Sequence, residues 1–189
     1  MKNIAVTGSF ASGKSFVLNA VKRMRYKVFS CDDYVGQLYE DIVFQKLIEN
    51  EIEGFGKFNK KALAKIIFSS DRMREKLQKI IHPMVLEGIR EFEEDNIKEE
   101  LVFTEVPLLF EADFDKYFAH NVCVFCSEMV RRERAKSRNK ISGEDFFEKI
   151  NKIQFSQEEK IKRSDFSIDS EIDIHEIEDS LKNIISSVI

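Results

Sequence analysis

The most constraining feature of this sequence is an eight-residue stretch near its start that fits the pattern G-x-x-x-x-G-K-[ST]. It runs from Gly8 to Ser15. The apolar residues 4–6 predict a short strand directly before it, and the apolar spacing within 14–25 predicts a helix directly after it. A loop placed between a strand and a helix in this way presents backbone N–H groups to a phosphate. The pattern therefore predicts a nucleotide-binding phosphate loop.

Positions within this loop have separate expected roles. Gly8 and Gly13 allow backbone angles and a close approach that a side chain would block. Lys14 is expected to reach the β- and γ-phosphate oxygens, and the Ser15 hydroxyl is expected to ligate Mg²⁺. GTPases, motor ATPases and small-molecule kinases share such a loop, so the loop does not name the reaction. Because GTPase switch motifs are not evident and the chain is short for a motor ATPase, a small-molecule kinase is favoured.

Apolar runs beyond the loop predict a parallel sheet. A strand, a helix and a second strand follow one another within residues 4–30, which is the order of a βαβ unit. Near the end of the chain, apolar residues recur along one stripe of a helix within 174–188. The expected fold is an α/β, three-layer P-loop NTPase core with a parallel sheet. Its predicted strands are residues 4–6, 27–30, 101–106, 121–126 and 166–168.

Two long excursions interrupt this core. About seventy residues separate the second and third strands, and they indicate helices over 36–52, 59–69 and 71–96, the last interrupted at Pro83. A strongly charged segment with a helical pattern follows the fourth strand. We expect it to form a lid that excludes water from the phosphoryl group being transferred. The expected parts are a core of residues 1–35, 97–128 and 160–189, a helical substrate-binding insertion at 36–96, and an arginine-rich helical lid at 129–159.

The composition limits the expected partners and compartment. The 189 residues include 30 basic and 34 acidic side chains, a net charge of −4, whereas a duplex-binding domain usually has a basic excess, so nucleic acid is not expected. No apolar run approaches the roughly 18 residues of a membrane span, and the apolar N-terminal stretch is too short for a signal peptide. We therefore expect a cytoplasmic protein without membrane partners. Cys123 and Cys126 form a C-x-x-C, but their apolar surroundings predict a buried strand.

Four acidic residues are expected near the carboxyl edge of the sheet, where ligands of open α/β sheets bind. Asp32 could accept the proton of an attacking hydroxyl or organise Mg²⁺, and helix capping by Asp32 or Asp33 is the alternative. Glu105 could hold Mg²⁺ through water or pair with a lysine, because a carboxylate in a buried strand needs a cation. Glu111 could serve an acceptor site or cap a helix.

Three arginines and one histidine complete the candidates. Arg131, Arg134 and Arg138 lie at i, i+3 and i+7, on one helical face. That face suits the phosphates of ATP and the charge that develops in phosphoryl transfer, and a solvated charged helix is the alternative. His82, next to Pro83, could act as a base or touch a substrate, although the residues alone favour a structural hydrogen bond.

Several short sequence motifs follow one another along the chain. They are Thr7-Gly8 through Lys14-Ser15, Val28 through Asp32, Gly56 through Leu63 and Phe68, Leu77 through Val85 with His82-Pro83, Val106 through Glu111 (VPLLFE), Arg134 and Arg138, and Gln154, Lys160 and Ser164-Asp165. Together they resemble the dephospho-CoA kinase family over roughly nine-tenths of the chain. The H-P and P-L-L-F-E elements are not general to phosphate-loop kinases, so the resemblance is specific.

The resemblance implies ATP-dependent phosphorylation of the 3′-hydroxyl of the dephospho-CoA ribose, which gives coenzyme A and ADP in the last step of coenzyme A synthesis. It implies Asp32 as the catalytic base, with Lys14 and Arg138 as further catalytic residues. The expected ATP-binding residues are Ala11, Ser12, Gly13, Lys14, Ser15, Phe16, Arg134 and Arg138. The expected dephospho-CoA-binding residues are His82, Pro83, Leu108 and Glu111, and the expected Mg²⁺ ligands are Ser15 and Glu105.

The chain departs from the family pattern at four positions. Ser30 replaces the first Asp of D-A-D, Gly36 falls where Arg is frequent, and Phe16 stands where Thr commonly follows the loop Ser. Lys60 replaces Arg, whose planar fork it cannot reproduce. These departures bear on the acceptor contacts. Two alternatives are a kinase for another small hydroxyl acceptor, such as a nucleotide, and a non-catalytic nucleotide-binding switch.

Overall fold

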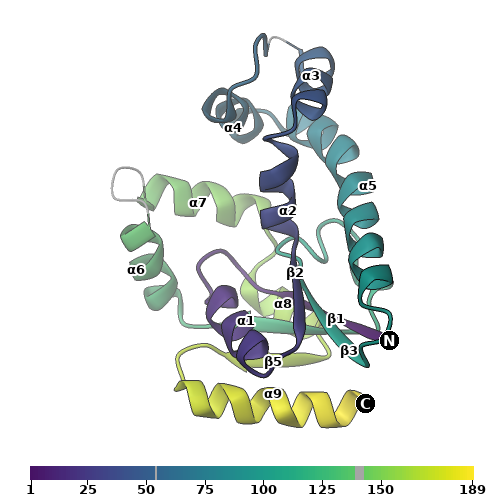
Figure 1. Cartoon of the computed structure of the whole chain (residues 1–189). Helices are drawn as coiled ribbons and strands as arrows, with labels where there is room; N and C mark the ends of the chain where they lie inside the picture. The colour runs from purple at the N-terminus through teal and green to yellow at the C-terminus, as the bar shows by residue number, and fades with distance from the viewer. Residues whose placement is uncertain (54, 139–142) are drawn as a thin grey trace. The chain divides into compact units, whose positions relative to one another are not determined.

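The computed structural model describes residues 1–53, 55–138 and 143–189, without the side chains of 138 and 143–146. In these residues the chain forms two compact units (Figure 1). One unit comprises Met1–Ser30 and Glu93–Ile189, and the other comprises Cys31–Phe92. The functional division into a core, an insertion and a lid remains a prediction.

The first unit is built on a parallel sheet whose strands follow the order β2-β3-β1-β4-β5 in the described residues. The strands are β1 (Lys2–Thr7), β2 (Lys27–Ser30), β3 (Leu101–Glu105), β4 (His120–Phe125) and β5 (Phe166–Asp169). Because β1 lies in the middle, it is covered on both faces, and Ile4 and Ala5 are fully buried. The predicted parallel α/β fold is confirmed, with strand ends shifted by one or two residues.

Helices cover both faces of this sheet. Those of the first unit are α1 (Lys14–Arg23), α6 (Glu128–Arg138), α7 (Gly143–Ile153), α8 (Gln157–Arg163) and α9 (Ile174–Val188), with a short 3-10 turn η1 (Asp115–Tyr117). Val17 and Val21 of α1 pack with Ile177 and Leu181 of α9 in the main core. This core fixes α1, and therefore the loop before it, against the sheet. None of the described helices is long and apolar enough to cross a membrane.

The second unit is helical and has its own apolar core. Its helices are α2 (Cys31–Leu38), α3 (Ile42–Glu51), α4 (Lys60–Ser69) and α5 (Asp71–Asp95), whose last turn lies in the first unit. Buried side chains from α3, α4, α5 and the α3–α4 connection form this core: Phe44, Ile48, Ile52, Phe55, Leu63 and Leu77.

The single helix predicted over 36–52 is wrong. Instead α2 ends at Leu38 and α3 begins at Ile42. Asp41 caps α3, because its side chain accepts hydrogen bonds from Val43 N at 2.6 Å and from Phe44 N at 3.1 Å. An Asp directly before a helical apolar pattern is a start signal for a new helix.

The interruption predicted at Pro83 is also wrong, because α5 continues through this proline. Proline removes one backbone hydrogen bond and costs about 3 kcal/mol inside a helix. Leu77, Val85 and Ile89 are nevertheless buried along α5 on both sides of Pro83. Burial of such side chains contributes roughly 1.5–3 kcal/mol each, which is enough to offset the proline.

Candidate active site

The predicted phosphate loop connects β1 to α1. Gly13, the residue before α1, has a φ of 96° and provides no side-chain cap. The first turn of α1 contains no acidic residue. The first N–H groups of a helix have no intrahelical partners, and the helix dipole makes this end electropositive. The start of α1 therefore offers backbone N–H groups to an anion.

Two glycines of the loop lie where a side chain would not fit. Gly8 has φ 150°, and a Cβ atom there would lie 2.3 Å from the carbonyl oxygen of Val124. A Cβ atom on Gly13 would lie 2.6 Å from Ser170 Oγ and 2.9 Å from Arg134 Nη1. The close approach of neighbouring segments, together with the backbone angles, requires glycine at both positions.

Replacing Gly13 by alanine is expected to destabilise the fold by about 1–3 kcal/mol, because the new Cβ meets the Ser170 side chain and strains a left-handed residue. ATP binding should weaken at the same time. Thermal unfolding and ATP titration measure the two effects. Gly36→Ala is the matched control, since nothing lies within 4 Å of its added Cβ, and a stability loss equal to that of Gly13→Ala would contradict the explanation.

Lys14, Ser15 and Phe16 are the first three residues of α1, directly after the loop glycine Gly13. The Lys14 ammonium donates to the carbonyl oxygens of Gly8 at 3.0 Å and Ser9 at 3.3 Å, which places its charge at the loop itself. Ser15 and Phe16 are exposed in the first turn of α1. The backbone N–H of Phe16 donates to Gly13 O at 2.9 Å.

The helix α6 contributes two arginines that support the loop. Arg134 donates to Ser170 Oγ at 2.8 Å and to Ser170 O at 3.1 Å, and Ser170 Oγ donates to Ser12 O at 2.6 Å. Arg131 is 7% exposed and donates to Phe10 O at 3.0 Å. Arg131 is therefore not part of a solvated helix face. The Arg138 side chain lies outside the described part of the chain.

Glu105 stands at the carboxyl end of β3, opposite Val6 of β1. Ser30, the last residue of β2, is its partner on the other side and donates a hydrogen bond to Glu105 Oε2 at 2.9 Å. The strand register thus places a carboxylate next to the strand that leads into the phosphate loop.

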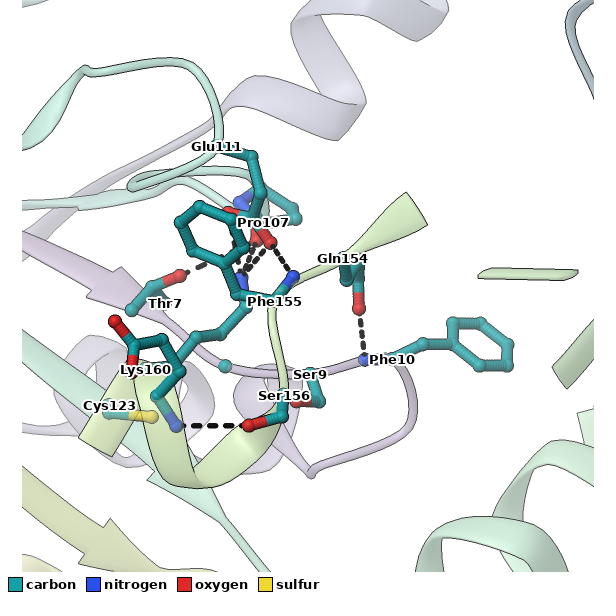
Figure 2. Close-up of polar contacts among 12 residues, drawn as sticks. Thr7, Ser9, Phe10, Pro107, Glu111, Cys123, Gln154, Phe155, Ser156 and Lys160 are labelled. Atoms are coloured by element: carbon teal, nitrogen blue, oxygen red, sulfur yellow. Dashed lines mark hydrogen bonds and ion pairs between the residues drawn. The ribbon is translucent and has the colours of Figure 1, made fainter. Parts of the chain in front are cut away.

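Glu111 forms a buried ion pair in this structure (Figure 2). Its Oε1 lies 2.8 Å from the ammonium of Lys160, a residue with no solvent exposure. Burial lowers the pKa of Lys160, and the Glu111 carboxylate opposes that shift. Glu111 Oε1 also accepts from Phe155 N at 2.8 Å. Leu108, on the same segment, is half-buried.

The other candidates belong to the second unit. Asp32 and Asp33 are exposed in the first turn of α2, where negative charge favours the helix start, so neither residue precedes the helix as a cap. His82 is half-buried within α5, where burial lowers its pKa and favours the neutral imidazole. Pro83 is exposed.

The two cysteines of the C-x-x-C stretch are buried. Cys123 lies within β4, and Cys126 follows the end of that strand. Burial raises the pKa of Cys123 to about 11, which keeps its thiol protonated. The predicted buried strand is therefore confirmed.

Known proteins resemble the chain along its whole length. The family model for dephospho-CoA kinase matches residues 2–176. The chain belongs to the dephospho-CoA kinase family. The dephospho-CoA kinase of Rickettsia bellii is 39% identical to it over 188 residues, covering 100% of this chain and 98% of the relative. The predicted family and the predicted kinase class are both confirmed.

Solved structures share the fold of this chain. The crystal structure of TT1252 from Thermus thermophilus has a TM-score of 0.83 and 26% identity, covering 100% of this chain and 98% of that one. The dephospho-CoA kinase from Campylobacter jejuni shares the fold, with a TM-score of 0.64 and 22% identity over 98% of this chain and 96% of that one.

Some residues that contact the loop were not predicted to do so. Ser170 bridges Arg134 to the loop and lies directly after β5, so its place at the carboxyl end of a strand was an available signal. Gln154 accepts a hydrogen bond from Phe10 N at 2.9 Å. Its position after a charged helix gives no local sign of that contact.

Proposed function

We propose that this chain transfers the γ-phosphoryl group of ATP to the 3′-hydroxyl of the dephospho-CoA ribose, with coenzyme A and ADP as products. The uncapped start of α1, with Gly13 at φ 96° and no acidic residue in its first turn, carries the proposal. Such a helix start binds phosphate oxygens through its backbone N–H groups. Membership of the dephospho-CoA kinase family supports the choice of donor and acceptor.

Loop residues hold the donor in this proposal. The backbone of residues 11–16 surrounds the phosphates, and the ammonium of Lys14 lies on the β- and γ-phosphate oxygens. Arg134 donates a hydrogen bond to the Ser170 side chain, which lies against Gly13 of the loop. We assign the guanidinium of Arg138 to the charge that develops on the transferred group.

Asp32 is proposed as the general base. Its carboxylate takes the proton of the 3′-hydroxyl as that oxygen forms a bond to the γ-phosphorus and the bond from phosphorus to ADP breaks. Asp32 is exposed in the first turn of α2, where the helix dipole favours a negative charge. The helical second unit, with His82 and Pro83, is proposed to bind dephospho-CoA together with Leu108 and Glu111.

The oxygen donors near the loop fit Mg²⁺. Ser15 presents an exposed hydroxyl at the start of α1, and Glu105 presents a carboxylate at the end of the neighbouring strand β3. Mg²⁺ prefers such oxygen ligands and usually binds through one or two protein groups plus substrate phosphates. We propose Ser15 as a direct ligand and Glu105 as a ligand through water. When bound, the ion neutralises charge on the β- and γ-phosphates.

An acceptor panel tests this function. With ATP and Mg²⁺, turnover of dephospho-CoA is expected to exceed that of nucleoside monophosphates by about a hundredfold or more in kcat/KM. Release of ADP and the mass of the coenzyme A product measure it. Phosphorylation of a nucleotide but not of dephospho-CoA would favour a kinase for another acceptor. Tight ATP binding without any transfer would favour a non-catalytic switch.

A further inference from the structure

Gln154 follows α7 and contacts the phosphate loop from far along the chain. Its side-chain oxygen accepts a hydrogen bond from Phe10 N at 2.9 Å (Figure 2). The backbone N–H of Gln154 donates to Ile150 O at 3.0 Å, which continues the last turn of α7. One peptide group of the loop is therefore held by the end of α7.

Arg131 of α6 contacts the same loop residue, Phe10, at its carbonyl group. Phe10 O accepts from Arg131 Nε at 3.0 Å, and Arg131 Nη2 donates to Asn151 Oδ1 at 2.6 Å. The Arg131 guanidinium also lies 5.1 Å from the ring centroid of Phe147. Phe10 is thus fixed at both its N–H and its C=O.

These contacts adjoin a strained part of the loop. Ala11, the next residue, has φ 62°, in the left-handed region that L-residues other than asparagine and aspartate rarely adopt. A residue in such a conformation persists only when its surroundings hold it there. The two hydrogen bonds on Phe10 supply that restraint directly before Ala11.

A buried ion pair anchors the segment that carries Gln154. Phe155, the next residue, donates its N–H to Glu111 Oε1 at 2.8 Å, and Glu111 is paired with the fully buried Lys160. The Lys160 ammonium also donates to Pro107 O at 2.7 Å (Figure 2). Because loss of either partner would leave an uncompensated buried charge, this pair keeps the segment in one place.

We propose that Gln154 is a positioning residue for ATP binding, which fixes the Phe10 peptide group so that the following loop amides face the phosphates before ATP arrives. The inference rests on the proposed function in naming ATP as the ligand. A loop ordered in advance loses less conformational freedom on binding. Loss of the Gln154 acceptor should therefore weaken ATP binding and leave the chemical step and acceptor binding unchanged.

Gln154→Met tests the proposal, since methionine has a similar length but no carbonyl acceptor. The Kd and KM for ATP are expected to rise about fivefold to tenfold, the value of one lost hydrogen bond. The kcat at saturating ATP and the KM for dephospho-CoA should equal those of the unaltered protein. Equal increases in both KM values, or a fall in kcat alone, would overturn the assignment.

Gln157→Met is the matched control. The Gln157 side chain also binds the backbone of one residue. It accepts a hydrogen bond from Cys126 N at 3.3 Å and donates one to Cys126 O at 2.9 Å. Its loss removes comparable hydrogen bonds without removing the one on Phe10. ATP affinity should therefore stay unchanged, and a loss equal to that of Gln154→Met would overturn the proposal by showing a general effect of destabilisation.

Amide hydrogen exchange at Phe10 provides a readout that does not depend on activity. Exchange without substrates is expected to be faster in Gln154→Met and unchanged in Gln157→Met, and Gln154→Glu, which keeps an acceptor oxygen, should retain protection. Faster exchange in Gln154→Met with unaltered ATP affinity would contradict the proposal. If the unaltered protein does not phosphorylate dephospho-CoA, the proposed function fails, whereas exchange and ATP binding still decide the role of Gln154.

Discussion

Replacing Asp32 by asparagine is expected to lower kcat by about a hundredfold to ten-thousandfold, the usual contribution of a general base. Asparagine keeps the size of the side chain but cannot take the proton of the 3′-hydroxyl. The affinity for ATP should stay nearly unchanged, because the donor is held by the phosphate loop. Steady-state kinetics with dephospho-CoA and a separate ATP titration measure the two quantities.

Asp33→Asn is the control for this experiment. Asp33 is the neighbouring carboxylate, and it is likewise exposed in the first turn of α2. Its replacement removes the same charge from the same helix start, so any effect of the helix dipole is matched. Equal losses of turnover in the two variants would show that charge at this helix start, rather than proton transfer to Asp32, supports the reaction.

Replacing Lys14 by methionine is expected to lower kcat/KM by about a thousandfold, as the loss of a preorganised charge at the transferred group does. The Lys14 ammonium already lies within the loop, on Gly8 O and Ser9 O, so its charge is in place before the nucleotide binds. Methionine retains most of the side-chain length and removes that charge. Initial rates at varied ATP concentration measure the loss.

Lys22→Met controls for loss of a lysine from the same helix. Lys22 is exposed in the last turn of α1, at the end opposite to the loop. Its replacement should change the rate little, and thermal unfolding of both variants identifies any loss of folded protein. A Lys14→Met protein that turned over like Lys22→Met would exclude the proposed contact with the phosphates.

Local patterns predicted the loop and the sheet well because their signals lie in neighbouring residues. Residues 8–15 contain the turn glycines, the start of the helix and the proposed phosphate-binding lysine within one short segment. Mostly apolar runs such as Leu101–Glu105 likewise indicate buried strands. The error at Pro83 has a similar local origin. The propensity of one residue was given more weight than the apolar spacing of Leu77, Val85 and Ile89 along the same helix.

The support of the loop could not be predicted in the same way, because it depends on contacts between distant segments. Ser170 Oγ donates to Ser12 O across 158 positions of the chain, and Gln154 meets Phe10 across 144. No spacing rule connects such pairs. Arg131 illustrates the consequence: a solvated helix face was the alternative for its position, and the fold buries it beside Phe10.

A crystal structure with a non-hydrolysable ATP analogue and dephospho-CoA would show whether the phosphate loop and Asp32 hold the reacting groups. We predict the β- and γ-phosphates on the amides of residues 11–16 and on the Lys14 ammonium. The 3′-oxygen of the ribose should lie about 2.6–3.2 Å from the Asp32 carboxylate, the distance at which a general base acts. Phosphates bound away from the loop, or a 3′-oxygen beyond the reach of Asp32 even through one water, would contradict the proposed mechanism.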